Sequence, residues 1–419
     1  MRNINLREYE CSDILDSKFL HSFKDFLQHK HLEDAFSFEL DQIRASSYIG
    51  AVKFKQTQIN VLPKVLSCDE DRKNTLHNLI FMLSYVNKLK IKDSGLVALS
   101  KAKNPFLEVL ITFFADSLLD ALLADIPHNY ESQNENLKFI KGKIDFKNHI
   151  KHNSFNNAKI FCLFDEFKED NKLNQFFKFI SYALMQLSNV IETKNKLKNI
   201  LDIYSEVSDI RITEEISNTI KINRWQQSFA QPLKLAKLFL ANSSINMCGN
   251  SFETIAILFD MNVLFEEFVF EALKELLPDK YKIESQKQKR IIDGLYSAFM
   301  EPFVIPFKIS TRTDILITVP SGQKIIVDTK YKLIDFYENK NPSAGDIYQM
   351  MAYSKVYNVE NVILLYPQWK RPFYHHAAFN QFEGLNLNII TVNLLQKLIK
   401  SSLQVNFKEI LNLLTSEGL

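Results

Sequence analysis

The spacing of hydrophobic and polar residues changes several times along the chain, and each change predicts an element. Alternation in SYIGAVKFKQTQINVLPKV (Ser47–Val65) predicts two short strands that end near Pro63. Apolar residues spaced by three and four predict helices instead. These helices are expected at Asn74–Val86, Phe106–Asp125, Lys172–Val207 and Trp225–Ala241. Between them, the polar stretch Asn129–Asn157 is expected to be an extended or hairpin connection.

A short run of small polar residues, NSSINMCGNS (Asn242–Ser251), predicts a boundary before the C-terminal part. Beyond it we expect the order helix, three strands, helix and strand. The predicted elements are Ile255–Leu277, Tyr281–Ser285, Ile315–Val319, Lys324–Thr329, Ser343–Tyr357 and Val362–Tyr366. This order is typical of an α/β domain with a mixed sheet. The chain is therefore predicted to be mixed α/β, with a β-rich region at 1–157, a helical region at 158–250 and the α/β domain at 251–419.

Composition adds few constraints. A hydrophobic content of 46% in 419 residues suits a large buried core, and a net charge of +2 neither requires nor excludes a nucleic-acid partner. No apolar run reaches the roughly eighteen residues of a membrane-spanning helix. The start, MRNINLREYE, lacks the apolar segment of a signal peptide, and the four cysteines form no C-x-x-C pair. We expect a cytoplasmic protein with no membrane partner.

Charged residues end two of the predicted strands, in TRTDILITVPSGQKIIVDTKYKL. The turn V-P-S-G-Q suits a three-residue loop with glycine in the left-handed position. That loop places Asp314 opposite Asp328, whereas a two-residue loop would place Asp314 opposite Thr329. Lys330 follows Asp328 by two residues, so both side chains share one face of the strand. The turn therefore predicts a cluster of two carboxylates and one lysine.

Two adjacent aspartates repel each other and require a cation to stay ionised. Mg²⁺ suits them, with Mn²⁺ as an alternative, because hard cations prefer oxygen ligands. A lysine beside the metal suits hydrolysis of a phosphodiester. A lone D-x-K triplet arises often by chance, so the prediction depends on the strand register. Gln349 and Tyr353 lie on one face of the next helix, although an ordinary amphipathic helix would show the same spacing.

The segments T-D-I-L-I, V-D-T-K-Y-K and D-I-Y-Q-M-M-A-Y together resemble the PD-(D/E)xK nuclease superfamily, in the variant with a Q-x-x-x-Y helix. More closely, they resemble the McrC family, the nuclease subunit of McrBC-type 5-methylcytosine-specific restriction systems. Looser similarity extends over most of the chain. It is found in YIGAVKFKQTQINVLPKV, FIKGKIDFKNHIKHN, FDEFKEDNKLN and LFDMNVLFEEFV.

The resemblance implies roles for individual residues. The implied catalytic residues are Asp314, Asp328, Lys330, Gln349 and Tyr353, with the two aspartates also as metal ligands. Glu266 matches a further metal-binding acid on the preceding helix. Helical phase does not separate Glu266 from Glu267, so this choice rests on the resemblance alone. Thr313 stands where the motif usually has proline, which affects the backbone more than the chemistry.

The resemblance also implies a function. We expect a Mg²⁺-dependent DNA endonuclease subunit that acts on double-stranded DNA in a complex with an McrB-like AAA+ GTPase. Region 1–157 would dock on that partner. The sequence has no G-x-x-x-x-G-K-[ST] phosphate loop, so the nucleotide would be hydrolysed by the partner. Two alternatives stay open: a free-standing nuclease of DNA repair or recombination, and a non-catalytic subunit that only stimulates an NTPase.

Two runs of basic residues, KYKIESQKQKR and WKRPFYHH, are candidates for contact with the DNA backbone. The residues concerned are Lys287, Lys289, Arg290, Lys370 and Arg371. Basic runs of this kind are more often solvated loops, so the prediction is weaker than the one for the carboxylate cluster.

Overall fold

The computed structural model of the protein describes most of its 419 residues. The described residues are 2–29, 32–64, 72–87, 89, 105–154, 158–248, 251–292, 295–296, 304–305, 309–368, 372–378, 384–394 and 398–416. Helices and several β-sheets occur along them, which confirms the expected mixed α/β class. Within these ranges, no helix combines the length and the apolar character needed to cross a membrane.

The chain forms two compact units, each made of segments that are far apart in the sequence. Unit 1 contains Met1–Ile4, Gly50–Asn60 and Ala102–Leu258, and unit 2 contains Asn5–Ile49, Val61–Lys101 and Phe259–Leu419. The chain passes from one unit to the other within β1 (Arg2–Arg7), β4 (Tyr48–Phe54), β5 (Thr57–Leu62) and β10 (Ser251–Asp260). This division differs from three consecutive regions at 1–157, 158–250 and 251–419, because these strands pair with partners distant in the sequence.

Strands β4 and β5 confirm the two strands predicted in Ser47–Val65; Val65 itself lies outside the described residues. They belong to a five-stranded sheet in the order β1-β5-β4-β10-β9. The predicted boundary Asn242–Ser251 is wrong, since it contains β9 (Ser243–Cys248), which pairs antiparallel with β10. The start of the predicted helix Ile255–Leu277 is wrong too, because its first residues belong to β10. A short continuous apolar run such as IAILF does not distinguish a buried strand from a helix.

Helices are the main secondary-structure elements of unit 1. They are α4 (Pro105–Ala124), α5 (Phe146–Asn153), α6 (Lys172–Leu187), α7 (Ile191–Ile203), α8 (Glu214–Thr219), η2 (Arg224–Phe229) and α9 (Ala230–Ala241). The single helical region predicted at Lys172–Val207 is thus two helices. Ser188 lies at the break, and its hydroxyl donates to the buried carboxylate of Glu108 at 2.9 Å. The backbone N–H of Asn189 donates to the same carboxylate, which stabilises the interruption.

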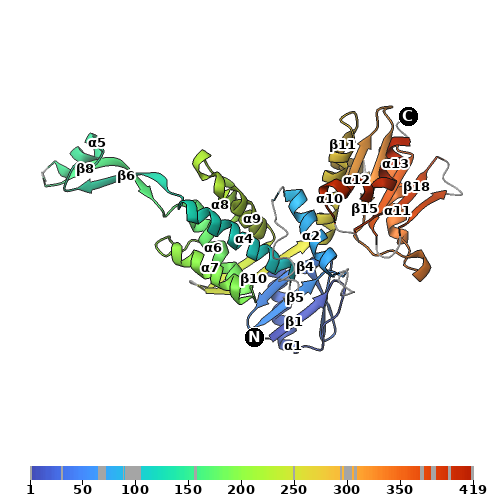
Figure 1. Ribbon diagram of the computed structural model, residues 1–419, viewed down its shortest axis with the longest axis horizontal. Helices are drawn as coiled ribbons and strands as arrows, with labels where there is room; N and C mark the ends of the chain where they lie inside the picture. The colour runs from blue at the N-terminus through green and yellow to red at the C-terminus, as the bar shows by residue number, and fades with distance from the viewer. Residues whose placement is uncertain are drawn as a thin grey trace. The chain divides into compact units, whose positions relative to one another are not determined.

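A three-stranded hairpin extends from unit 1, in the order β6-β8-β7. Its strands are β6 (Asn129–Leu137), β7 (Lys143–Ile144) and β8 (Ile160–Lys168), and α5 lies between β7 and β8 in the sequence. Figure 1 shows the hairpin projecting away from α4, α6 and α7, with α5 at its far end. A hairpin was one of the two alternatives predicted for Asn129–Asn157, whereas α5 and the continuation into β8 were not predicted. Asp145 begins α5 by accepting a hydrogen bond from the N–H of Asn148 at 3.1 Å.

The carboxylate cluster predicted from the sequence belongs to the six-stranded sheet of unit 2, in the order β11-β14-β15-β16-β18-β17. The strands are β11 (Lys282–Ile292), β14 (Ile309–Thr318), β15 (Lys324–Thr329), β16 (Asn361–Pro367), β17 (Tyr374–Ala378) and β18 (Asn386–Val392). Neighbouring strands are antiparallel from β11 to β15, parallel from β15 to β18, and antiparallel again at β17. The predicted mixed sheet is confirmed, whereas β17 and β18 were not predicted.

The remaining elements of unit 2 are mostly helical. They are α1 (Ser17–His29), η1 (Glu33–Ala35), β2 (Phe36–Glu39), β3 (Gln42–Ala45), α2 (Arg72–Asn87), α10 (Met261–Leu276), β12 (Leu295–Tyr296), β13 (Val304–Ile305), η3 (Phe336–Glu338), α11 (Ala344–Tyr357), η4 (Lys400–Ser402), α12 (Leu403–Asn406) and α13 (Lys408–Ser416). Helix α2 confirms the prediction at Asn74–Val86. Helix α11 begins at the predicted capping box, in which Ser343 and Asp346 satisfy each other's backbone N–H groups.

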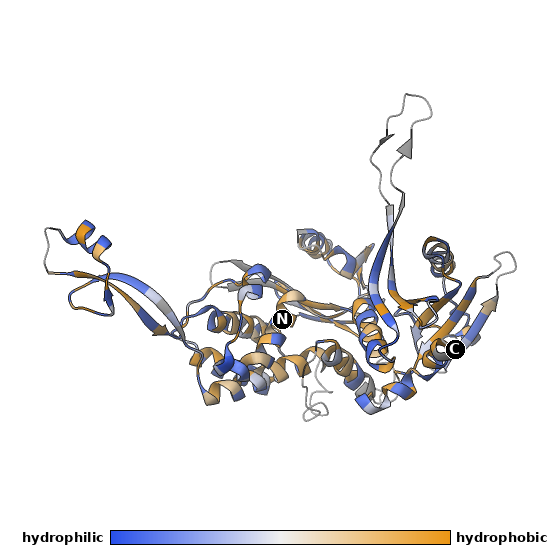
Figure 2. Cartoon of the chain, turned by 90° about the horizontal axis from the view of Figure 1, so that it is seen from above, coloured by the Kyte–Doolittle hydropathy of each residue, from blue (hydrophilic) through white to orange (hydrophobic). Residues whose placement is uncertain are grey.

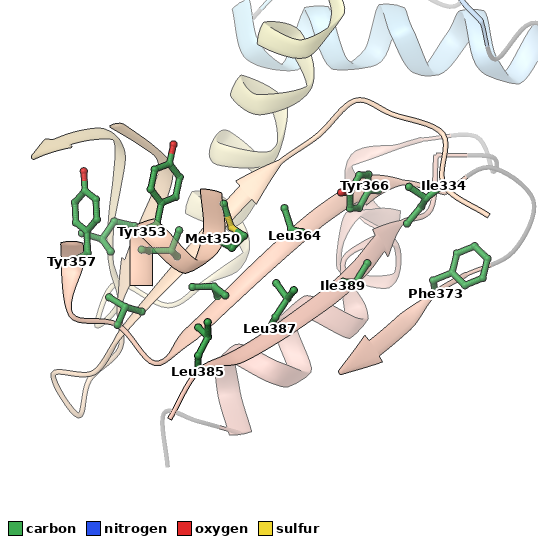
Figure 3. Packing of buried hydrophobic residues seen from close by; sticks show 14 residues of the cluster. Ile334, Met350, Tyr353, Tyr357, Leu364, Tyr366, Phe373, Leu385, Leu387 and Ile389 are labelled. Carbon is green, nitrogen blue, oxygen red and sulfur yellow. The ribbon is translucent and has the colours of Figure 1, made fainter. Parts of the chain in front are cut away.

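The core beside α11 fixes this helix against the sheet (Figure 3). Met350 of α11 lies beside Leu364 of β16. Tyr353 of α11 and Leu387 of β18 belong to the same cluster, and all four side chains are buried. Burial of such side chains contributes about 1.5–3 kcal/mol each relative to exposure. The helix that carries the predicted Q-x-x-x-Y pair is therefore held firmly beside the strand that carries Asp328.

Candidate active site

The turn between β14 and β15 sets the register of the candidate site. The N–H of Val319 donates to the carbonyl of Gln323 at 2.9 Å, and Gly322 has a left-handed φ of +88°. The paired residues are Ile315 with Val327, Leu316 with Ile326, Ile317 with Ile325 and Thr318 with Lys324. One residue further along this register, Asp314 comes opposite Asp328. The predicted three-residue loop and its register are confirmed.

Asp328 is a completely buried carboxylate near the end of β15. Neither of its oxygens has a hydrogen-bond donor in good geometry, although Oδ2 lies 2.5 Å from Nζ of Lys330. Burial and then the nearby charge of Asp314 raise the pKa of Asp328 to about 7. A buried carboxylate without donors is costly when ionised, so this position favours a bound cation.

Lys330 lies immediately beyond β15, where its backbone N–H donates to the carbonyl of Leu365 in β16 at 2.9 Å. Burial is the largest single influence and disfavours the charged ammonium group, but the charges of Asp328, Asp314 and Asp346 together outweigh burial, so the pKa of Lys330 is raised. Its side chain is mostly buried, with 18% exposed. The lysine is therefore a fixed positive charge at the edge of the carboxylate pair.

Asp314 is oriented by the residue between Asp328 and Lys330. Both the backbone N–H and the hydroxyl of Thr329 donate to Oδ2 of Asp314, at 2.8 and 3.0 Å. These two bonds aim the carboxylate across the hairpin toward Asp328. The sequence analysis did not identify Thr329 as a site residue, because the D-x-K pattern leaves its middle position open.

Glu266 lies on α10, and the structure separates it from Glu267. Burial and then the charge of Asp314 raise the pKa of Glu266, whereas burial and then Glu271 raise that of Glu267. Nε2 of Gln286 also donates to Oε1 of Glu266 at 3.2 Å. The β11–β14 register puts Gln286 opposite Asp314. Glu266 is therefore the acid that faces the carboxylate pair, and Gln286 is a neighbour that no sequence motif indicated.

Gln349 and Tyr353 contact each other as their spacing predicted. Nε2 of Gln349 donates to the hydroxyl of Tyr353 at 2.7 Å, and that hydroxyl donates to the carbonyl of Arg312 at 2.7 Å. Arg312 precedes Asp314 by two residues on β14. Burial and then the charge of Asp328 raise the pKa of Tyr353, so its hydroxyl stays a donor at neutral pH. The pair ties α11 to the strand that carries the first aspartate.

The donor set fits a Mg²⁺ ion. The buried carboxylate of Asp328, whose Oδ1 has no hydrogen-bond donor, lies opposite a second carboxylate. One or two carboxylates with water are an ordinary set of ligands for this metal. Among the residues that the structure describes, no three His, Cys, Asp or Glu side chains are grouped closely enough to enclose a metal. A role for Glu266 as a third ligand stays a prediction.

The predicted DNA-contacting residues are only partly described. Lys287 is exposed on β11, and its ammonium lies 2.8 Å from a carboxylate oxygen of Glu284. Lys289 is exposed on the same strand and donates to the carbonyl of Val356. Outside the described residues lie the side chain of Arg290 and the whole of Lys370 and Arg371. DNA contact by these residues stays a prediction.

Comparison with known proteins identifies similar sequences and folds. Residues 43–367 match the family model described as McrBC 5-methylcytosine restriction system component. The type IV methyl-directed restriction enzyme EcoKMcrBC of Escherichia coli (strain K12) is 23% identical over 340 residues, which are 77% of this chain and 93% of that protein.

Two solved structures share the fold. One is a chain from a half-complex of the tetradecameric assembly of Thermococcus gammatolerans McrB AAA+ hexamers with bound McrC. It is 21% identical, with a TM-score of 0.69 and coverage of 98% of this chain and 99% of that chain. The other is from the Thermococcus gammatolerans McrBC complex, with 23% identity, a TM-score of 0.50 and coverage of 65% and 87%.

Proposed function

We propose, for a chain that belongs to the McrBC 5-methylcytosine restriction system component family, that this protein is the DNA-cleaving subunit of a modification-dependent restriction complex. Its reaction is Mg²⁺-dependent hydrolysis of phosphodiester bonds in double-stranded DNA, with Mn²⁺ as a substitute metal. The observation that carries the proposal is the buried carboxylate of Asp328, which lies opposite Asp314 and 2.5 Å from the Lys330 ammonium and whose Oδ1 has no hydrogen-bond donor. This arrangement is the core of the PD-(D/E)xK pattern.

Each site residue has a role in this proposal. Asp314 and Asp328 hold the metal, with Glu266 beside them as a further ligand. When bound, the metal would offset the negative charge of the two carboxylates and stabilise the charge that develops on the attacked phosphate. Lys330 carries a fixed ammonium next to Asp328, from which it donates a hydrogen bond to the attacking water or to a phosphate oxygen. Tyr353 positions β14 through the carbonyl of Arg312.

The proposal includes a partner resembling the AAA+ protein McrB. A chain with the same fold comes from an assembly of McrB AAA+ hexamers with bound McrC. Because this sequence contains no phosphate-binding loop, the partner would supply nucleotide hydrolysis and the recognition of modified DNA.

We assign partner docking to the projecting hairpin formed by β6, β7, α5 and β8. Its exposed hydrophobic side chains are Tyr130, Phe139, Ile140, Phe146, Ile150, Leu163 and Phe167. Figure 2 shows hydrophobic residues interspersed with hydrophilic ones at the far end of the hairpin and on α5. Exposed apolar side chains that gather on one element are typical of a protein–protein interface. The hairpin begins inside region 1–157, to which the sequence analysis assigned docking, and ends beyond it with β8.

Reconstitution with the McrB-like partner tests the proposal. Plasmid cleavage and GTP turnover are measured together on methylated DNA, for the wild type and for Asp328→Ala and Lys330→Ala. Each substitution should reduce cleavage about a hundredfold or more, since each removes a well-placed electrostatic group. GTP turnover should persist in both variants, because the docking hairpin is intact.

The two readings that compete with the proposal give different results. Normal cleavage by Asp328→Ala would exclude a nuclease that acts through this site. If the wild-type complex stimulates GTP hydrolysis and never cuts DNA, the chain is a non-catalytic subunit. Cleavage by this protein without any AAA+ partner, at the same rate as with it, would identify a free-standing nuclease.

A further inference from the structure

Glu8 and Lys64 form a buried pair in unit 2, just beyond the ends of β1 and β5. The side chain of Glu8 is fully buried and that of Lys64 is 10% exposed. The backbone N–H of Lys64 donates to Oε2 of Glu8 at 2.9 Å, whereas Nζ of Lys64 lies 3.9 Å from Oε1. Oε1 has no hydrogen-bond donor. The carboxylate therefore lies near the ammonium group without being its closest partner.

The closest partner of the Lys64 ammonium is the backbone of Tyr331. Nζ donates to the carbonyl of Tyr331 at 2.6 Å. It also lies 4.2 Å from the ring centre of Tyr331 and 5.0 Å from that of Tyr9, within the range of cation–π contacts. Two aromatic rings, a carbonyl and a carboxylate thus surround one ammonium group.

Tyr331 directly follows Lys330, at the point where the chain leaves β15. The Lys330 N–H still bonds to β16, but the carbonyl of Tyr331 accepts from Lys64 instead of from a neighbouring strand. The ring of Tyr331 lies 5.8 Å from that of Phe265, which precedes Glu266. Lys64 therefore contacts the backbone one residue away from the proposed catalytic lysine.

We propose that Lys64 is a positioning residue that holds the backbone beyond β15, so that the Lys330 ammonium stays beside Asp328. This inference rests on the proposed nuclease function and adds a residue from the N-terminal half of the chain to it. Lys64 touches neither Asp314 nor Asp328 in the proposal; it acts through the carbonyl of Tyr331.

A purely stabilising role explains these contacts less well. Taking two charges out of water costs several kcal/mol, and a buried ion pair often contributes no more than apolar side chains of the same volume. Burial raises the pKa of Glu8 to about 7 and lowers the pKa of Lys64. Both shifts show that burial disfavours the charged forms of the two side chains. What an apolar side chain cannot supply is the hydrogen bond to the Tyr331 carbonyl.

Lys64→Met tests the inference, because methionine fills much of the lysine volume and cannot donate. We expect single-turnover DNA cleavage by the reconstituted complex to fall about ten- to a hundredfold, as is typical of a displaced catalytic group. The KM for DNA and the stimulation of GTP turnover should stay unchanged, whereas the midpoint of thermal unfolding should fall, because Glu8 is left as a buried charge without its neighbour. Lys18→Met, at an exposed lysine of α1, is the matched control and should cleave like the wild type.

A second variant separates positioning from folding. Glu8→Gln combined with Lys64→Met leaves no unpaired buried charge, so it should fold even if Lys64→Met alone does not, and should show the same loss of cleavage. Wild-type cleavage by this double variant would overturn the inference. In the double variant, a fall in thermal stability and in GTP stimulation proportional to the fall in cleavage would also overturn the inference. Lys330→Ala distinguishes the two proposals, because normal cleavage by this variant would refute DNA cleavage at the Asp328–Lys330 site, on which the inference about Lys64 depends.

Discussion

Nζ of Lys330 lies 2.5 Å from Oδ2 of Asp328, while Oδ1 of the same carboxylate has no hydrogen-bond donor. The lysine thus compensates one side of a fully buried charge and leaves the other side open. Asp314, which faces Asp328 and carries a charge of the same sign, makes ionisation of Asp328 still more unfavourable. A divalent cation would relieve both effects, which connects the proposed chemistry to properties that can be measured without DNA.

Removal of the Asp328 charge should change how stability depends on pH. The pKa of Asp328 is about 7 in the folded protein and about 4 in an unfolded chain. The folded state binds this proton more tightly, so the free energy of unfolding should fall as pH rises from about 4 to about 7. In Asp328→Asn this contribution is absent. Urea unfolding in the presence of a chelator measures this. Between pH 5 and pH 8 the free energy of unfolding should decrease less for Asp328→Asn than for the wild type.

Added Mg²⁺ at pH 8 should raise the free energy of unfolding of the wild type, because ligand binding stabilises the folded state. It should leave the free energy of unfolding of Asp328→Asn nearly unchanged. Equal pH dependence in the two proteins would contradict the assigned environment of Asp328.

Glu266 and Glu267 provide a matched pair for testing the third metal ligand. Only Glu266 is influenced by the charge of Asp314. We expect Glu266→Gln to weaken Mg²⁺ binding about tenfold or more, as typically follows the loss of a supporting acid. Calorimetric titration with Mg²⁺ measures this, and Glu267→Gln serves as the control. Equal effects of the two substitutions would remove Glu266 from the site.

The hydroxyl of Tyr353 should contribute measurably to the stability of unit 2. Tyr353→Phe keeps the ring in the core but leaves the Arg312 carbonyl without its donor. We expect the free energy of unfolding to fall by about 1–2 kcal/mol. Tyr348→Phe, at a tyrosine of the same helix that is 67% exposed, should change it by less than about 0.5 kcal/mol. Urea unfolding compares the two, and equal stabilities would show that this hydroxyl does not anchor β14.

Gly142 should be necessary for the shape of the docking hairpin. Its φ is +73°, and a Cβ there would lie 2.5 Å from the carbonyl oxygen of Leu163. Gly142→Ala must therefore displace the segment before β7, and we expect it to reduce stimulation of GTP turnover. Mg²⁺ binding by the Asp328 site should be unaffected. The control is Gly345→Ala, because the nearest atom to a Cβ there is 3.8 Å away. Full stimulation by Gly142→Ala would place docking elsewhere.

Local patterns predicted the geometry around the carboxylate pair. The turn V-P-S-G-Q determined the register, and the capping box at Ser343 gave the start of α11, because both depend on residues close in sequence. The spacing of Gln349 and Tyr353 likewise predicted their contact. These features could be derived before any tertiary structure was known.

Features that depend on distant pairing were not predicted. The apolar run in β10 was assigned to a helix, because nothing in the run shows that β9 pairs with it. The choice between Glu266 and Glu267 required the position of Asp314. Lys64 carried no signal at all, since its role depends on Tyr331, far along the chain. In each case the deciding neighbour lies outside the sequence window that a pattern covers.

The interleaving of the two units has a consequence during protein synthesis. Unit 2 needs Asn5–Ile49 and Val61–Lys101 together with Phe259–Leu419, so it cannot be completed until all of Ala102–Leu258 has left the ribosome. Lys64 is translated early, whereas Asp328 and Lys330 are translated late. The proposed metal site would therefore be completed last, after the hairpin to which we assign docking has been made.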